Sequence, residues 1–160
     1  MTDPTYSTAI ERKSERELVV TRAFNAPARI VFEAWTQPDQ FTRWWVPKSA
    51  GMTLLSCEMD VRLGGGYRLV FAGNPQPIAF FGKYLGVTPN ARLSWSNDES
   101  PDGAVTTVTF EERGGNTRVV LCDRYPSKEA LDAAIASEST GAFTEQFAQL
   151  DELLVVSKAG

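Results

Sequence analysis

The feature that most limits what this chain can fold into is a change of hydrophobic period near Thr53. From there to Arg124, apolar and polar residues alternate in short runs, which is the pattern of half-buried β-strands. Turn signals separate these runs at Gly64-Gly65-Gly66, Gly73-Asn74-Pro75, Pro89-Asn90 and Gly114-Gly115-Asn116. Consecutive strands joined by short turns predict an antiparallel sheet built from hairpins.

Helical or strand-like segments flank this region on both sides. Residues 17–24 are rich in β-branched residues and predict a first strand that ends before Pro27. Two short helices are expected next, the first ended by Pro38 and the second by Pro47. After a Ser127 N-cap, one apolar stripe predicts a single long helix, interrupted by Gly141 and carrying Leu131, Ile135, Phe143, Phe147, Leu150 and Leu154.

The order of these elements predicts an α+β fold. Sheets made of hairpins twist and curl, so we expect a curved antiparallel sheet wrapped around the long C-terminal helix, with the two short helices after strand 1 at its open end. The length of 160 residues suits one domain. We expect residues 16–157 to form it and residues 1–15, which are polar and mixed in charge, to be a flexible tail.

Composition excludes several kinds of function. The chain has no histidine, which removes His-dependent catalytic triads and His metal sites, and its two cysteines form no CxxC motif. We therefore expect no metal and no cofactor. A net charge of −4 without a basic cluster argues against a nucleic-acid partner. No run reaches the roughly 18–20 apolar residues of a membrane span, so we expect a cytoplasmic protein with no membrane contact.

A curved sheet rarely contacts a helix along its whole length, and the remaining gap is a natural ligand site. Alternate strand positions and the inner faces of the helices would line this gap. The expected lining residues are Trp44, Trp45, Cys57, Met59, Leu69, Phe71, Phe80, Tyr84, Trp95, Phe110, Phe143 and Phe147. The alternative is an ordinary packed core, which is where aromatic side chains are found more often.

Few polar residues are candidates for chemistry, and we assign none a catalytic role. Glu58 and Asp60 alternate with apolar neighbours and are expected on the solvated outer face. Tyr84 and Arg124 are candidates for polar anchors inside the fold. Asp123 shares a face with apolar residues near a strand end, where it would either bind a ligand or mark the rim of the sheet.

Several segments resemble one family. The run LVVTRAFNAPARIVFEAWTQPDQFTRWWVP (18–47) resembles the opening of bacterial homologues of the activator of heat-shock-protein ATPase, within the START-like or SRPBCC superfamily and its helix-grip fold. The similarity continues in the same order through CEMDVRLGGGYRLVF, GKYLGVTPNARLSW and TVTFEERGGNTRVVL to the C-terminal helix, and covers roughly residues 17–155.

The resemblance implies several functions. Superfamily members bind lipids, hormones, polyketides and other hydrophobic ligands, and some are cyclases, dehydratases or lyases. We therefore expect binding of a small hydrophobic ligand between the sheet and the C-terminal helix, without chemistry. The alternatives are a cofactor-free cyclase or lyase acting on a hydrophobic substrate, and a co-chaperone-like regulator in the stress response whose surface binds a chaperone as protein partner.

The chain departs from the family pattern at two positions. The usual Trp-Trp-Gly-Pro reads Trp44-Trp45-Val46-Pro47, which reduces backbone freedom at the expected cavity mouth. The usual Gly-Trp of the last helix reads Gly141-Ala142. This second change predicts extra space near Ala142 unless Phe143 fills it.

Overall fold

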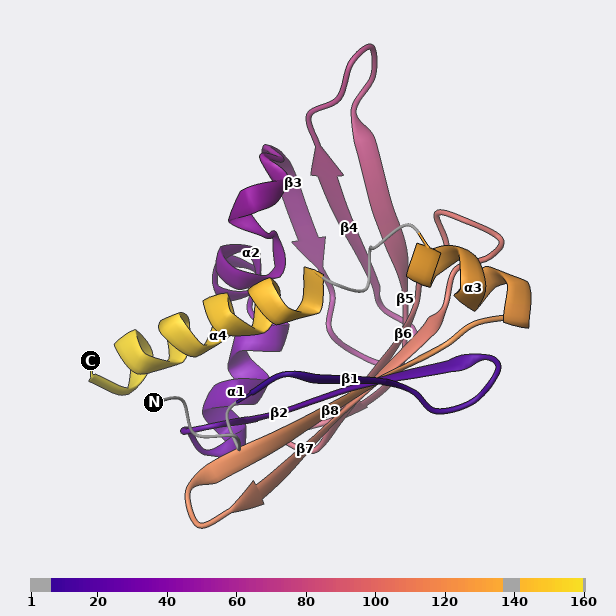
Figure 1. Ribbon diagram of the computed structural model, residues 1–160. Coiled ribbons are helices and arrows are strands. Elements are labelled where there is room, and N and C mark those ends of the chain that lie inside the picture. Colours follow the sequence, from indigo (N-terminus) through magenta and orange to yellow (C-terminus); the bar gives the residue numbers. More distant parts are fainter. Residues whose placement is uncertain (1–6, 137–141, 160) are drawn as a thin grey trace.

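The body of the protein is an eight-stranded antiparallel sheet, seen in a computed structural model that describes residues 7–136 and 142–159 (Figure 1). The strand order is β1-β2-β8-β7-β6-β5-β4-β3, so the sheet is open, with β1 and β3 at its edges. The strands are β1 Ala9–Arg12, β2 Glu17–Phe24, β3 Leu54–Met59, β4 Gly66–Phe71, β5 Ile78–Thr88, β6 Arg92–Ser96, β7 Val105–Arg113 and β8 Asn116–Arg124.

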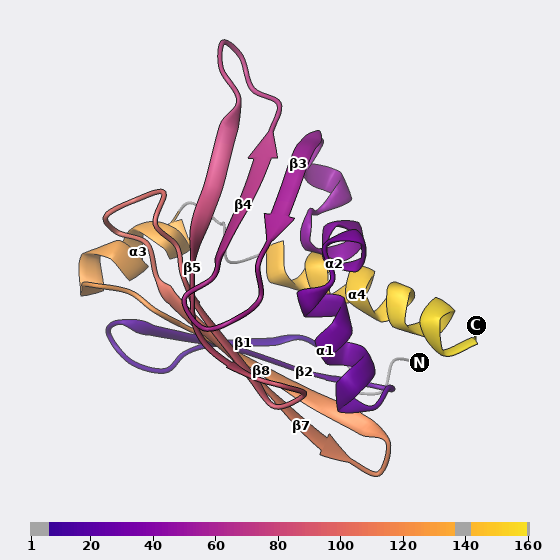
Figure 2. The ribbon, with the colours of Figure 1, turned by 180° about the vertical axis from the view of Figure 1, so that it is seen from behind.

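The helices lie mainly on the side toward which the sheet curves (Figures 1 and 2). Strands β3 to β5 rise away from the layer formed by β1, β2, β7 and β8, and α1, α2 and α4 occupy the angle between these two parts. The helical segments are α1 Ala28–Thr36, α2 Pro38–Trp45, the short 3-10 helix η2 Lys48–Ala50, α3 Lys128–Ala136 and α4 Ala142–Ala159. The α+β, helix-grip fold class is thereby confirmed.

The C-terminal region differs from the single long helix that the apolar stripe predicted. Two helices, α3 and α4, are separated by residues 137–141, and Gly141 lies outside the described residues. The Ser127 cap is present, because its Oγ accepts a hydrogen bond from the Ala130 amide at 3.0 Å. The stripe combined the apolar faces of two helices that point in different directions (Figure 1), and Ile135 near the end of α3 is exposed.

Two further local expectations are wrong. Residues 9–12, expected within a flexible tail, form strand β1 paired with β2. All four side chains of β1 are exposed, so no alternation of apolar and polar residues marked it as a strand. In β3, alternation with Cys57 and Met59 predicts that Leu55 faces inward, but a register shift between Leu54 and Ser56 reverses the phase. Leu55 is therefore 55% exposed, while Leu54 is partly buried and packs on the core.

The hydrophobic core is centred on the indole of Trp35 in α1. Its ring lies 4.6–6.5 Å, centroid to centroid, from six other aromatic rings: those of Phe41, Trp44, Trp45, Trp95, Phe110 and Phe147. These rings come from α1, α2, α4 and two strands, and most of the pairs are edge-to-face, the favoured geometry for aromatic contacts. At the other end of α1, a Glu112 carboxylate oxygen of β7 accepts a hydrogen bond from the Ala28 amide at 2.7 Å. The helix is therefore fixed at both ends.

Helix α4 holds the end of α2 through two glutamine side chains. Gln149 Nε2 donates to the carbonyl oxygens of Trp44 and Val46, each at 2.9 Å, and its Oε1 accepts from the Lys48 amide at 2.9 Å. Gln146 Nε2 donates to the Trp45 carbonyl at 2.6 Å. The last carbonyl groups of a helix have no partner within it, so these side chains supply the missing hydrogen bonds.

Replacing Gln149 by Leu should therefore lower the free energy of unfolding. The variant keeps the side-chain volume but leaves two carbonyls and one amide without partners in a mostly buried position, which we expect to cost about 2–4 kcal/mol. Urea denaturation followed by far-UV circular dichroism would measure the change. Gln37→Leu, at an exposed position without a side-chain cap hydrogen bond, is the matched control and should change stability by less than about 0.5 kcal/mol. Equal stability of the two variants would contradict this role for Gln149.

Candidate functional site

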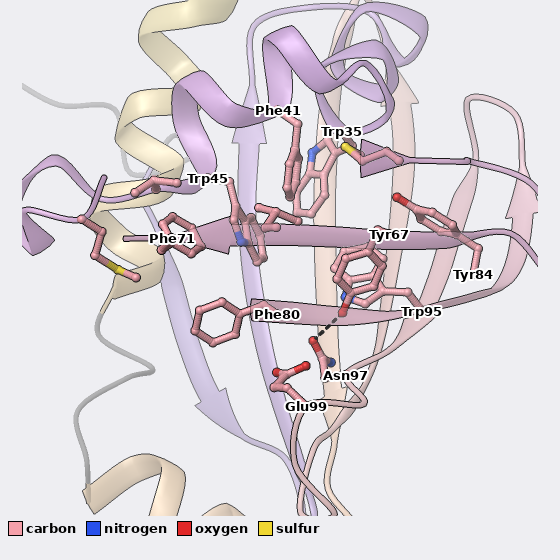
Figure 3. A pocket seen from close by; sticks show the side chains of 14 residues that line it. Trp35, Phe41, Trp45, Tyr67, Phe71, Phe80, Tyr84, Trp95, Asn97 and Glu99 are labelled. Carbon is pink, nitrogen blue, oxygen red and sulfur yellow. Dashed lines mark hydrogen bonds between the residues drawn. The ribbon is translucent and has the colours of Figure 1, made fainter. Parts of the chain in front are cut away.

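A cavity of about 260 Å³ lies between the helices α1 and α2 and the strands β3 to β6 (Figure 3). Its walls are largely aromatic. The lining residues are Trp35, Phe41, Trp45, Val46, Met52, Met59, Tyr67, Leu69, Phe71, Phe80, Tyr84, Trp95, Asn97 and Glu99. Met52 and Phe80 are 40% and 37% exposed, so the cavity opens to solvent beside them.

The position of this cavity corrects the expected one. None of the described residues that line it belongs to α4, although we expected the space between the sheet and the C-terminal helix. The inner face of α4 is packed instead, because Phe147, Leu150 and Leu154 are buried in the core. Phe147 contacts the rings of Phe24 and Trp35 edge-on, at 5.7 and 6.2 Å. This cavity lies where the sheet rises away from α4, whereas a second cavity, described below, is bordered by Phe143 of α4.

The structure divides the predicted lining residues into two groups. Those in the cavity wall are Trp45, Met59, Leu69, Phe71, Phe80, Tyr84 and Trp95. The others lie elsewhere: Trp44 is fully buried with its Nε1 donating to the Ala34 carbonyl, Phe110 packs edge-on against Phe32, and Phe147 belongs to the α4 core. Cys57 is partly buried beside that core, and Phe143 lines a second cavity.

Sequence reasoning missed other residues of the wall. Helical periodicity predicts that Trp35 and Phe41 face inward, and alternation with Leu69 and Phe71 predicts the same for Tyr67. The sequence therefore contained the information to place these three residues. Val46 stands where the family pattern has glycine, and its side chain now lines the cavity. Met52 follows η2, and Asn97 and Glu99 follow β6, in segments without periodicity. No sequence pattern points to those three residues.

Four polar residues form a chain of hydrogen bonds that starts at the cavity wall. The Tyr67 hydroxyl donates to Asn97 Oδ1 at 3.2 Å (Figure 3). It also donates to the Ser96 carbonyl at 2.8 Å. Asn97 Nδ2 donates to Thr106 Oγ1 at 3.1 Å, and Thr106 Oγ1 donates to Asp123 Oδ1 at 2.5 Å. Each donor in this chain points toward Asp123, which is the arrangement that stabilises a carboxylate.

The tyrosine hydroxyls of the cavity stay neutral over the physiological pH range. Burial, followed by the nearby carboxylates of Glu99, Asp98 and Asp123, raises the pKa of Tyr67 far above its ordinary value. Burial is also the main cause of the raised pKa of Tyr84. Both groups therefore present hydroxyls rather than phenolates to anything that enters the cavity.

A second cavity of about 300 Å³ adjoins the first. Both are lined by Trp45, Trp95, Asn97 and Glu99, which form their common wall. The remaining lining residues of the second cavity are Gly103, Ala104, Thr106, Leu121, Asp123, Tyr125, Ala134 and Phe143. Ala142 lines neither of these two cavities, whereas the adjacent Phe143 lines the second.

Asp123 is the most unusual group in this region. The residue is only 8% exposed, so it is buried and does not mark a solvated rim of the sheet. Burial raises the pKa of Asp123 to about 6, although the hydrogen bond from Thr106 acts in the opposite direction. At neutral pH this carboxyl is mostly ionised in an environment that disfavours its charge. Such groups are concentrated at functional sites.

The other polar candidates face solvent. Glu58 and Asp60 are exposed, as predicted, and Asp60 pairs with Arg62 on the surface at 2.8 Å. Arg124, expected as an inward polar anchor, is exposed because it follows the inward-facing Asp123 on an alternating strand. Among the described residues, no group of three or more histidine, cysteine, aspartate or glutamate side chains is placed to hold a metal ion.

A curved antiparallel sheet, with helices in its concavity and an apolar cavity between them, defines a helix-grip protein of the START type. A sequence model of the family described as "Activator of Hsp90 ATPase homolog 1-like protein" matches residues 25–155. The chain therefore belongs to this family, which confirms the resemblance. In the part of the chain that the structure describes, no helix is long and apolar enough to cross a bilayer.

Solved bacterial structures share the fold. A protein from Rhodobacter sphaeroides is 24% identical, with a TM-score of 0.84 and coverage of 94% of this chain and 99% of that one. A protein from Nitrosomonas europaea is 22% identical, with a TM-score of 0.82 and coverage of 93% and 100%. A protein from Staphylococcus epidermidis is 25% identical, with a TM-score of 0.76 and coverage of 93% and 94%. A comparison with curated proteins found no match.

The buried carboxyl of Asp123 should make the free energy of unfolding depend on pH. Because the pKa of Asp123 is higher in the folded than in the unfolded chain, its burial costs roughly 3 kcal/mol at pH 8, and this cost disappears as the pH falls from 6 toward 4. Asp123→Asn should therefore be about 2–3 kcal/mol more stable than the wild type at pH 8 and equally stable near pH 4. Urea denaturation at the two pH values tests this. Asp102→Asn, at an exposed position, is the control. A gain in the stability of Asp123→Asn that did not depend on pH would contradict the raised pKa of Asp123.

Proposed function

We propose that the protein binds a small, mainly apolar molecule in the cavity between α1–α2 and β3–β6. The observation that carries this proposal is an aromatic-walled space of about 260 Å³ inside a helix-grip fold. A dry apolar cavity of about 150 Å³ already admits benzene, and typical ligand pockets begin near 300 Å³. The cavity thus has room for a molecule of one or two rings.

The arrangement of the wall supports binding rather than packing alone. Trp45 and Trp95 form an edge-to-face pair with ring centroids 6.3 Å apart, and Phe71 and Phe80 form another at 5.6 Å. These rings offer flat apolar surfaces, while Tyr67 and Asn97 provide polar atoms on one side. A few polar groups in an apolar pocket are the usual means of orienting a ligand. The indole Nε1 of Trp35 is, among the described residues, a buried donor without an acceptor, which is a further feature typical of functional sites.

A cavity-filling substitution tests whether the space is used. Leu69→Phe should fill part of the cavity, change the free energy of unfolding by less than about 1 kcal/mol and weaken ligand binding at least tenfold. The matched control is Leu150→Phe, where the leucine is fully buried in the α4 core and overpacking should cost about 1–3 kcal/mol. Thermal denaturation and ligand titration would measure both effects. Destabilisation of Leu69→Phe equal to that of Leu150→Phe would show that no usable space exists.

The bound molecule can be sought directly. Organic extraction of the purified protein, followed by mass spectrometry, would reveal a co-purified ligand, and a thermal-shift panel would rank candidates, since a ligand at 100 times its Kd adds about 2.7 kcal/mol. Recovery of added compounds unchanged would support binding alone. Conversion of a compound would support the enzymatic alternative, a cofactor-free cyclase or lyase. If no compound in an apolar panel shifted the melting temperature, the proposal would fail.

A second function is favoured by the family to which the chain belongs, because its description names an activator of the Hsp90 ATPase. A co-chaperone acts through its surface, and β5 carries exposed apolar side chains, Phe81 and Leu85, away from the cavity. The test is the rate of ATP hydrolysis by an Hsp90-type chaperone from the same organism, with and without this protein. An unchanged rate at saturating protein would remove this candidate.

A further inference from the structure

The second cavity contains a carboxylate, that of Asp123, which has no positively charged partner among the residues that the structure describes. Within the described residues, the Asp123 carboxylate has a single hydrogen bond, from Thr106, and forms no ion pair. Two oxygens with about four acceptor positions are therefore served by one donor. A buried carboxylate is normally paired with a cation or with several donors, so this one is equipped to accept a further donor.

The surroundings of Asp123 favour a cation over an anion. The titratable groups that face it are Glu99 and Tyr125 in the same cavity and Tyr67 at the other end of the hydrogen-bond chain, and none of them can be positively charged. Cys122 precedes it on the opposite face of β8, where Glu17 accepts a hydrogen bond from its thiol at 3.8 Å. None of the described residues that line either cavity is basic.

The common wall of the two cavities adds a second element of cation recognition. Trp45 and Trp95 line both spaces, and their indole planes are inclined by 76° to each other. Two indole faces set at a steep angle attract a cation through their quadrupoles, as in the aromatic cages that bind ammonium groups. An apolar body in the first cavity would place an attached polar group near this wall and toward Asp123.

We propose that the second cavity recognises the ammonium group of an organic amine, with Asp123 as its counter-ion, while the apolar part of the same molecule occupies the first cavity. This inference rests on the proposed function, because it concerns the charged end of the same ligand. It excludes fatty acids and other carboxylates as preferred ligands, since Asp123 and Glu99 would repel them.

The test uses three probes of similar size that differ in their polar end: 2-phenylethylamine, 2-phenylethanol and 3-phenylpropionate. Calorimetric titration of the full-length protein at pH 7.5 should give an affinity for the amine at least tenfold above that for the alcohol, with the acid weakest. Binding of the alcohol alone reports on the apolar cavity. If the alcohol binds and the amine is no better, the inference fails and the proposed function stands. If none of the probes binds, both fail.

Asp123→Asn separates the carboxylate from the rest of the cavity. The asparagine oxygen can still accept the hydrogen bond from Thr106, so the alcohol should bind as to the wild type while the preference for the amine disappears. Asp102→Asn serves as the control for a general change of charge, and should keep the preference. A variant Asp123→Asn that retained the tenfold preference would overturn the role of Asp123 as counter-ion.

The pH dependence of the wild type provides a second, independent measurement that does not require the variant to fold. Protonation of Asp123 removes the counter-ion, so the ratio of amine to alcohol affinity should be constant above about pH 7 and fall by about tenfold between pH 7 and pH 5. A ratio that stays flat over this range would overturn the inference.

Discussion

The carbonyl groups at the C-terminal end of α2 need hydrogen-bond partners once they are covered, and the rest of the site depends on how α4 provides them. Gln146 and Gln149 bind three of these carbonyls and one following amide. This fixes the segment that carries Trp45 and Val46, which line the cavity together with Phe41 of the same helix. The inner face of α4 beyond Phe143 is closely packed through Phe147, Leu150 and Leu154, so the first cavity lies away from this helix and the second borders it at Phe143.

The bend of the sheet separates a packed half from a hollow half. The layer of β1, β2, β7 and β8 lies under α1 and α4, where Phe110 and Phe147 contact the Trp35 indole and Phe24 packs edge-on against Phe147. Strands β3 to β5 rise away from α4 and enclose the cavity together with Trp35 of α1, the short helix α2 and the chain that follows it. Eight strands that twist and bend cannot remain in contact with one straight helix along their whole length. The cavity is the consequence of that mismatch.

Much of the fold was predictable from the sequence, because alternation and turn chemistry act locally. The β7–β8 hairpin turns at Gly114 and Gly115, both of which have positive φ, as a tight reversal requires. Strand β1 was not predictable, because its pairing with β2 provides backbone hydrogen bonds but buries none of its side chains. The split between α3 and α4 was hidden because helical periodicity does not record where a chain changes direction. In the site, the periodicity of helices and strands predicted that Trp45, Leu69 and Trp95 line the cavity. Asn97 and Glu99 reach the cavity from a loop, whose conformation no local sequence pattern predicts.

Two compartments that share a wall cannot be filled independently. Both rings border both cavities, so a rotation of the Trp45 or Trp95 indole changes the shape of both spaces. If an occupant of the first cavity changes the binding affinity of the second, thermodynamic linkage requires that an occupant of the second cavity change the affinity of the first by the same factor. A guest molecule that extends from one cavity into the other would therefore have to pass along the Trp45–Trp95 pair.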